Sequence, residues 1–166
     1  RLWDPATGEA VSTAEGHTGA VRGVCPVRAG DRELLASASD DRTVRLWDPA
    51  TGESVATLKG HRGGVNGVCP VRAGDRDLLA SASIDQTVRL WDLSSGTLLS
   101  TLAGHPSGVR AVALTADGRR ALSGSSDRTV RLWNLSSGAL LRTLPGHPSG
   151  VTAVAVTADG QRALSG

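Results

Sequence analysis

The four tryptophans of this 166-residue chain stand at nearly even intervals. They occupy positions 3, 47, 91 and 133, and each lies in the string Arg-Leu-Trp followed by Asp or Asn. The four histidines, at positions 17, 61, 105 and 147, keep the same spacings of 44, 44 and 42 residues, and each follows a glycine. A period in the forties predicts a repeat architecture, in which each unit buries its faces against its neighbours.

Within one period the local signals are those of β-structure. The strings VNGVCPV, DLLASAS, TVRLWD and SVATL predict four short strands, because they are rich in β-branched and apolar residues. Turn sequences separate them: ADG at 116–118 and 158–160, ATG at 50–52, and SSG at 94–96 and 136–138. No segment keeps helical periodicity for ten residues. The sequence therefore predicts an all-β fold of propeller blades, each with four antiparallel strands.

The order of the predicted strands divides residues 1–166 into three complete blades and two half-blades. The complete blades are predicted at 17–59, 61–103 and 105–145. Residues 1–15 supply an outer half-blade and 147–166 an inner one, so the single array holds about four blade-equivalents. We expect a fragment of a longer propeller, since the chain contains no Met and ends abruptly. Alternatively, two copies close one ring, with 147–166 of one completing 1–15 of the other.

Two dipeptides recur with this period. Gly-His stands at 16–17, 60–61, 104–105 and 146–147, and Trp-Asp at 3–4, 47–48 and 91–92. With these motifs the whole chain resembles the WD-repeat β-propeller family, although Trp133–Asn134 departs from the second motif. The resemblance implies a radial propeller that serves as a non-enzymatic platform for assembling other molecules.

Each full repeat also carries a histidine, a serine, an aspartate and a tryptophan at matching places. The sets are His17, Ser37, Asp41 and Trp47; His61, Ser81, Asp85 and Trp91; and His105, Ser123, Asp127 and Trp133. The resemblance implies that each set forms a buried relay from the indole N–H through serine and histidine to the aspartate. A Ser-His-Asp set is also what nucleophilic catalysis uses, but an active site is needed once, whereas this set recurs in every blade. We expect a structural relay and no enzyme in this segment.

Metal and cofactor sites are not indicated by the spacing of the possible ligands. Zinc sites need clustered ligands, whereas each histidine here belongs to a different repeat. Cys25 and Cys69 occupy the slot that Ala113 and Ala155 hold in the other repeats, which predicts small buried side chains. No phosphate-binding glycine motif is present in the sequence. We expect no metal and no cofactor.

Positions at which the repeats differ are candidates for partner binding, because the fold does not dictate them. The differences gather after the histidine and beside the turn aspartate, and in the WD-repeat family these positions open onto the top face around the central channel. The predicted partner-binding residues are Arg22, Asp40, Asn66, Ile84, Arg110 and Ser126. Their guanidinium groups suit carboxylates or phosphates. Free variation of exposed loop positions is the alternative interpretation.

Charge and hydropathy narrow the class of partner. The 18 basic and 16 acidic residues are interspersed, which argues against dedicated nucleic-acid binding. No apolar stretch approaches the roughly 20 residues of a membrane span, and the first residues lack the layout of a signal peptide. We expect a cytoplasmic scaffold for proteins or peptides, able to self-associate through open blade edges. The alternative is the sensor or recruiting arm of a larger signalling enzyme, such as a kinase, protease or NTPase, whose catalytic domain lies outside this segment.

Overall fold

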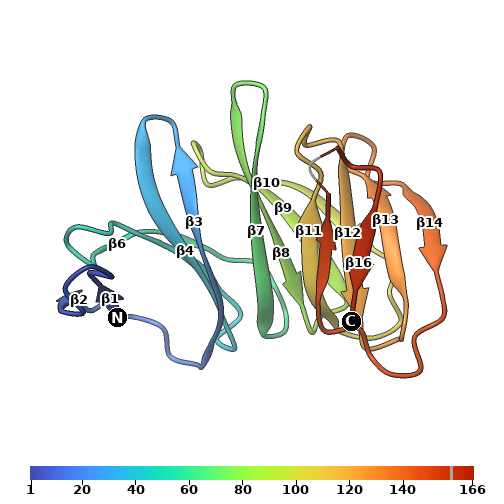
Figure 1. The fold of residues 1–166 in the computed structure, drawn as a ribbon, viewed down its shortest axis with the longest axis horizontal. Coiled ribbons are helices and arrows are strands. Elements are labelled where there is room, and N and C mark those ends of the chain that lie inside the picture. The colour runs from blue at the N-terminus through green and yellow to red at the C-terminus, as the bar shows by residue number, and fades with distance from the viewer. Residues whose placement is uncertain (158) are drawn as a thin grey trace.

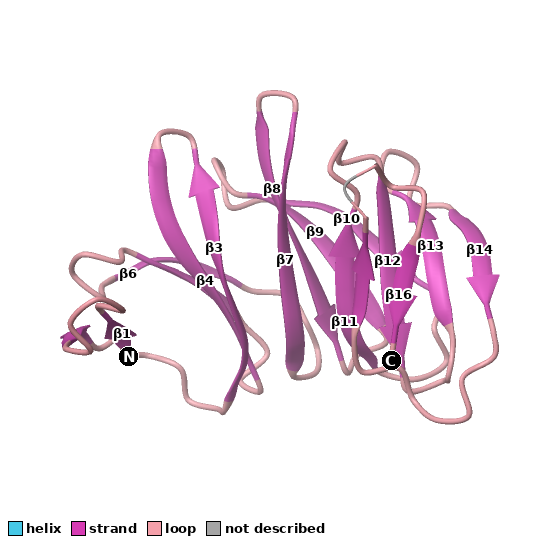
Figure 2. Ribbon diagram, in the orientation of Figure 1, coloured by secondary structure: helices cyan, strands magenta, loops and turns pink. Residues whose placement is uncertain are grey.

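β-Strands form the framework of this chain. The computed structural model describes residues 1–157 and 159–166, and within them lie three four-stranded and two two-stranded antiparallel sheets. The sheets stand side by side in chain order, from β1 and β2 at the left of the row to the orange and red strands at the right (Figure 1). Strands and loops account for the whole described chain (Figure 2). The predicted all-β array of propeller blades is confirmed.

Each four-stranded sheet follows chain order, so that consecutive strands are hydrogen-bonded neighbours. The first blade contains β3 (Val21–Ala29), β4 (Arg32–Ser39), β5 (Val44–Trp47) and β6 (Ser54–Leu58). The second contains β7 (Val65–Ala73), β8 (Arg76–Ser83), β9 (Thr87–Asp92) and β10 (Leu98–Ala103). The third contains β11 (Val109–Leu114), β12 (Arg120–Ser125), β13 (Val130–Asn134) and β14 (Leu140–Leu144). The two-stranded sheets are β1 (Leu2–Trp3) with β2 (Ala10–Ser12), and β15 (Val154–Val156) with β16 (Ala163–Ser165). The predicted turn at 158–160 includes Ala158, which lies outside the described residues.

The second strand of each blade is buried on both of its faces. In β8, Leu78 and Ala80 pack into the core shared with the third blade, whereas Leu79 packs into the core shared with the first. Side chains alternate between the faces of a strand, so a strand between two neighbouring sheets needs small or apolar residues at every position. This requirement explains the run of leucine, alanine and serine over residues 78–83, all of which are buried.

The hydrophobic core lies between the blades and not within them. The tryptophans of the second and third blades pack towards the preceding blade: Trp91 joins the core of the first blade, and Trp133 joins that of the second. A smaller cluster joins the third blade to β15, with Val130 and Val151 buried at its centre. Each blade is therefore stabilised by its neighbours, as in other repeat architectures.

The first two blades have longer hairpins than the third. Their first two strands run for 9 and 8 residues, whereas β11 and β12 have 6 each. The strands of the second blade also extend past the predicted strings, to Ala73 and from Arg76. The first two hairpins rise beyond the sheets at the upper edge of Figure 1. We call the turns between first and second strands the hairpin end of the blades, and the loops around the histidines and turn aspartates the relay end.

Candidate functional site

The predicted relay residues lie in a continuous chain of hydrogen bonds at the relay end. In the second blade the Trp91 indole Nε1 donates to Ser81 Oγ over 2.8 Å, and Ser81 Oγ lies 2.7 Å from His61 Nε2. His61 Nδ1 lies 2.8 Å from Asp85 Oδ2. The first and third blades repeat these contacts with distances of 2.7, 2.7 and 2.6 Å. The structure thus brings all twelve predicted residues together as three sets of four.

The direction of the donors assigns a neutral imidazole. Ser81 Oγ accepts the indole N–H, so its own proton is available to His61 Nε2, and Nδ1–H then donates to Asp85. A protonated imidazole would instead donate from Nε2 and leave the proton of the buried Ser81 hydroxyl without this acceptor. Burial is the largest cause that lowers the pKa of His61 and of His105, and it outweighs the hydrogen bonds to their aspartates.

The turn aspartate remains ionised because several donors converge on it. Burial raises the pKa of Asp85, but the Thr87 hydroxyl, the backbone N–H of Arg62 and His61 outweigh that effect and bring it to about 2. Thr87 Oγ1 donates to Asp85 Oδ1 over 2.6 Å, and the Arg62 N–H donates to Oδ2 over 2.9 Å. Asp85 therefore ties the loop before β7 to the turn between β8 and β9.

The relay serines of the second and third blades are fully buried. Ser81 and Ser123 have 0% relative exposure, and both hydroxyl groups are engaged by an indole and an imidazole. A nucleophilic serine needs an open side from which a carbonyl can approach and donors for the oxyanion. In these two blades the serine hydroxyl is enclosed by its indole and imidazole partners and has no open side.

The two half-blades hold the remaining copies of the pattern. Trp3, in β1, is 57% exposed, in contrast to the buried tryptophans of the full blades. His147 Nε2 lies 2.7 Å from Ser165 Oγ. The N-terminal half-blade therefore carries the tryptophan of the repeated relay set, and the C-terminal half-blade carries its histidine and serine.

The glycine and the arginine of the repeated motifs have a shared role that the sequence analysis missed. Gly60 has a φ of +147°, and a Cβ at this position would collide with the guanidinium group of Arg89 from the string Arg-Leu-Trp. Gly16 and Gly104 are packed in the same way against Arg45 and Arg131. Glycine precedes each of these histidines because both the backbone conformation and the close arginine disfavour a side chain. The regular recurrence of the arginine is the signal that could have revealed it.

Four of the six predicted partner-binding residues form two polar pairs at the relay end. Arg22 Nε donates to both carboxylate oxygens of Asp40 at 3.0 Å, and these bonds lower the pKa of Asp40. In the third blade, Arg110 Nε donates to Ser126 Oγ over 2.8 Å. Each pair lies within one blade, so the guanidinium groups are already oriented by their own loops.

The other two residues differ from each other in role. Ile84 is 55% exposed, and a Cβ at Gly64 would lie 3.3 Å from its Cδ1 and 3.0 Å from Asp40 Oδ1, so both side chains border Gly64. Asn66 is half-buried, and its amide donates to the Val109 carbonyl over 2.8 Å. Asn66 therefore links the second blade to the third, whereas Ile84 is available to a partner.

The two cysteines, predicted as small buried side chains, are only half-buried. Both Cys25 and Cys69 are free thiols. Burial and the neighbouring Cys69 raise the pKa of Cys25 to about 12. Burial also raises the pKa of Cys69. Within residues 1–157 and 159–166, no three His, Cys, Asp or Glu side chains are grouped as metal ligands. No helix in the described part of the chain is long and apolar enough to cross a membrane.

Four-stranded sheets packed face to face, each with a buried tryptophan tied to its turn aspartate, define a β-propeller repeat protein. The sequence profile of the WD domain, G-beta repeat family matches residues 8–48, 52–92, 96–134 and 138–166, and the chain belongs to this family. The predicted WD-repeat identity is confirmed. The first three matched segments each begin before the last strand of one sheet and end at the third strand of the next sheet. The repeat unit of the sequence is therefore offset by one strand from the blade of the structure.

One relative is similar to this chain over about the length of a single repeat. Over 45 residues the chain is 51% identical to the nuclear distribution protein PAC1-2 of Uncinocarpus reesii (strain UAMH 1704). The match covers 27% of this chain and 9% of that protein. The similarity therefore concerns the repeat unit and not the whole of either protein.

Proposed function

We propose that this segment is a non-catalytic platform that binds a protein or peptide partner at the relay end of its blades. WD repeats indicate a protein-interaction scaffold in general. The observation that carries the more specific proposal is the neighbouring placement of the exposed Ile84 and the Arg22–Asp40 pair, on either side of Gly64.

The charge and the rigidity of this patch suit a protein ligand. An exposed aliphatic side chain beside an oriented guanidinium group combines apolar contact with directional hydrogen bonding, and arginine is enriched in protein interfaces. The loops are held in place: the Asp40 N–H donates to the Ala20 carbonyl over 2.9 Å, and the Ile84 N–H donates to the Gly64 carbonyl over 2.9 Å. A preorganised surface loses less conformational entropy when it binds.

A charge-reversed variant tests this proposal. We expect Arg22→Glu combined with Arg110→Glu to lose a defined set of partners in quantitative affinity purification from the native cell. The matched control is Arg142→Glu, which changes an exposed arginine on the outer strand β14, and it should retain that set. Unchanged recovery by the double variant would contradict the proposal.

Self-association and a cytoplasmic location stay predictions. The exposure of Trp3 (57%) and Leu164 (76%) in the two half-blades supports association between copies, because exposed apolar surface favours burial against a partner.

A further inference from the structure

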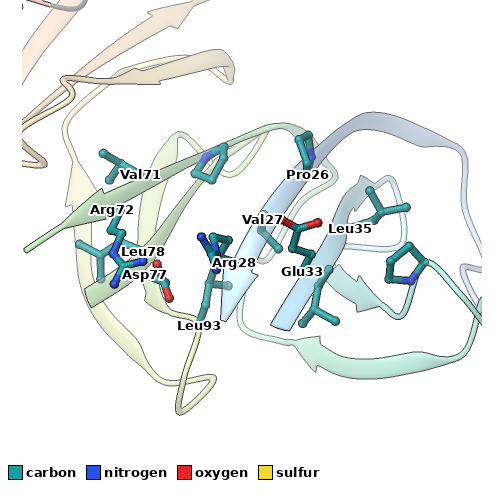
Figure 3. Close-up of a pocket in the computed structure, with 13 residues that line it drawn as sticks. Pro26, Val27, Arg28, Glu33, Leu35, Val71, Arg72, Asp77, Leu78 and Leu93 are labelled. Carbon is teal, nitrogen blue, oxygen red and sulfur yellow. The ribbon is translucent and has the colours of Figure 1, made fainter. Parts of the chain in front are cut away.

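A cleft of about 500 Å³ lies at the hairpin end, between the first and second blades (Figure 3). Each of its two walls belongs to a complete four-stranded sheet and pairs an arginine with an acid. In the strand register Arg28 stands opposite Glu33, and Arg72 stands opposite Asp77. The charges of this cleft are therefore matched within each wall.

Contacts within the chain hold the full blades together at this end. At the first junction the Gly30 N–H donates to Asp77 Oδ2 over 2.9 Å. The second junction is closed, because a Cβ at Gly118 would collide with the methyl group of Ala73 and the turn of the third blade packs directly on the end of β7. Both junctions thus join sheets that already have their neighbours.

A larger cleft, of about 600 Å³, lies against the opposite face of the first blade, beside the N-terminal half-blade. Its lining is largely apolar and includes Leu2 of β1 together with Val24 and Leu35 of the first blade. Val24 is 73% exposed, whereas Val112, at the same place in the third blade, is 8% exposed because the second blade covers it. In the described residues, this face of the first blade is left without a covering sheet.

The C-terminal half-blade carries the surface that covers such a face elsewhere in the molecule. Leu164 precedes the relay serine of β16, and the full blades have Ala36, Ala80 and Leu122 at this place. These three residues are 0%, 0% and 3% exposed, and each lies in the core shared with the following sheet. Leu164 itself is 76% exposed. The uncovered face and the surface that matches it are therefore both present in one chain.

The two half-blades also have complementary strand edges. Within residues 1–157 and 159–166, β1 pairs with β2 alone and β16 with β15 alone, whereas the second and third strands of every full blade pair with each other. In the register that β12 and β13 keep, Leu164 of β16 would stand opposite Leu2 of β1, and Arg162 opposite Asp4. An aliphatic pair and a pair of opposite charges both stabilise neighbouring strands.

The relay is divided between the two half-blades as well. His147 Nε2 lies 2.7 Å from Ser165 Oγ, as in the full blades, but the tryptophan that completes this set is Trp3 of the other half-blade. The indole N–H of each full blade donates to its serine over 2.7 or 2.8 Å. Joining the half-blades would bring the exposed indole of Trp3 to Ser165.

We propose that two copies of this chain join in a closed dimer, in which residues 147–166 of each copy complete residues 1–15 of the other. The two half-blades stand at opposite ends of the row of sheets, with three full blades between them, so the completing half comes from a second molecule (Figure 1). Leu164 enters the cleft beside Val24, and β16 pairs with β1. Each copy carries one half-blade of each kind, so the same contact forms twice and the assembly closes at two copies. This inference rests on the self-association proposed above and is independent of the partner surface at the relay end.

Sedimentation velocity of the 166-residue chain tests this proposal. We expect monomers at about 1 µM and dimers at about 100 µM, because short edge strands must offset the lost freedom of two molecules. In the dilute monomer Trp3 stays exposed. Leu164→Asp should weaken dimerisation by about tenfold or more, since it places a charge in an apolar cleft. Leu141→Asp is the matched control on the outer strand β14, where Leu141 is 48% exposed, and it should change the dissociation constant by less than about twofold.

Engineered cysteines locate the contact. In a background of Cys25→Ala and Cys69→Ala, Leu2→Cys combined with Leu164→Cys should give a covalent dimer on oxidation, because the register sets these side chains opposite each other. Val55→Cys combined with Leu164→Cys is the matched control, since Val55 is exposed on the outer strand β6, and it should give little of that product. A chain that stays monomeric at high concentration, a dimer unchanged by Leu164→Asp, equal cross-linking of both pairs, or assemblies that grow beyond two copies would overturn the proposal. None of these outcomes bears on partner recovery by the relay-end variants.

Discussion

The relay end and the hairpin end of the blades differ in how much they vary from blade to blade. At the relay end the distances from tryptophan to serine are 2.7, 2.8 and 2.7 Å in the three full blades, and those from serine to histidine are all 2.7 Å. At the hairpin end the strands shorten from 9 and 8 residues to 6, and one junction is open while the next is closed. The same repeat thus has one constant end and one variable end.

The difference has a physical cause. The relay end consists of buried polar groups, and each one needs the next as its hydrogen-bond partner, so a change in any member leaves a buried group unsatisfied. The hairpin end consists of backbone pairs and exposed turns, where two additional residues extend the ladder without exposing a buried polar group. A repeat can therefore acquire a new surface at the hairpin end at little cost in stability.

The largest effect that the comparison predicts comes from a buried relay tryptophan. We expect Trp91→Ala to lower the free energy of unfolding by about 3–5 kcal/mol, because it leaves a cavity between two blades and removes the donor to Ser81. Urea denaturation followed by far-ultraviolet circular dichroism measures it. Trp3→Ala is the matched control, and since Trp3 is 57% exposed its cost should be below about 1 kcal/mol. Equal costs would contradict a stabilising role for the relay.

The second prediction concerns pH. The pKa values of His61 and His105 are lowered in the folded chain, so the stability that their neutral forms contribute is complete above the unfolded pKa of about 6.5 and is lost as the pH falls below it. The pKa of Asp85, lowered to about 2, predicts a further loss as the pH falls from about 4 towards 2. Unfolding free energies measured between pH 8 and pH 5, where the histidines change charge, should decrease with acidification. The variant His61→Gln combined with His105→Gln should show a shallower decrease, and a rise in stability on acidification would contradict the assigned direction of the relay.

The smallest predicted effect sharpens the comparison at the hairpin end. In the second blade the Leu93 N–H donates to the Asp77 carbonyl over 2.9 Å, and in the third blade the Leu135 N–H donates to the Arg119 carbonyl over 2.9 Å. Pro49 stands at the same place in the first blade and has no N–H to donate to the carbonyl of Glu33. We expect Pro49→Leu to stabilise the chain by about 1 kcal/mol. Pro49→Ala, which restores the N–H without the larger side chain, separates the hydrogen bond from apolar burial. Destabilisation by both variants, measured by denaturation, would show that the proline suits this turn better than a backbone donor.

Recurrence made the relay predictable and left the partner residues less certain. His61, Ser81 and Trp91 stand out because the same residue types return in every full repeat, and the resemblance to the WD-repeat family implies that they form one relay. Positions that differ between repeats carry no such signal, and the structure separates them by role: Asn66 links two blades through the Val109 carbonyl, whereas Ile84 is exposed. The sequence could not distinguish these two residues, because both stand at positions that differ between the repeats.

The sequence by itself determined the period and the four strands of each blade, and its resemblance to the WD-repeat family indicated which repeated residues form the buried hydrogen bonds. These features depend on neighbours along the chain or on exact repetition, both of which can be read from the order of residues. The tertiary structure decided where neighbouring blades close and where they leave space. The bond from Gly30 to Asp77 and the cleft between Val27 and Val71 join residues more than 40 positions apart. Their distance is set by how side chains of two sheets pack together, and packing between sheets leaves no periodic pattern in the sequence.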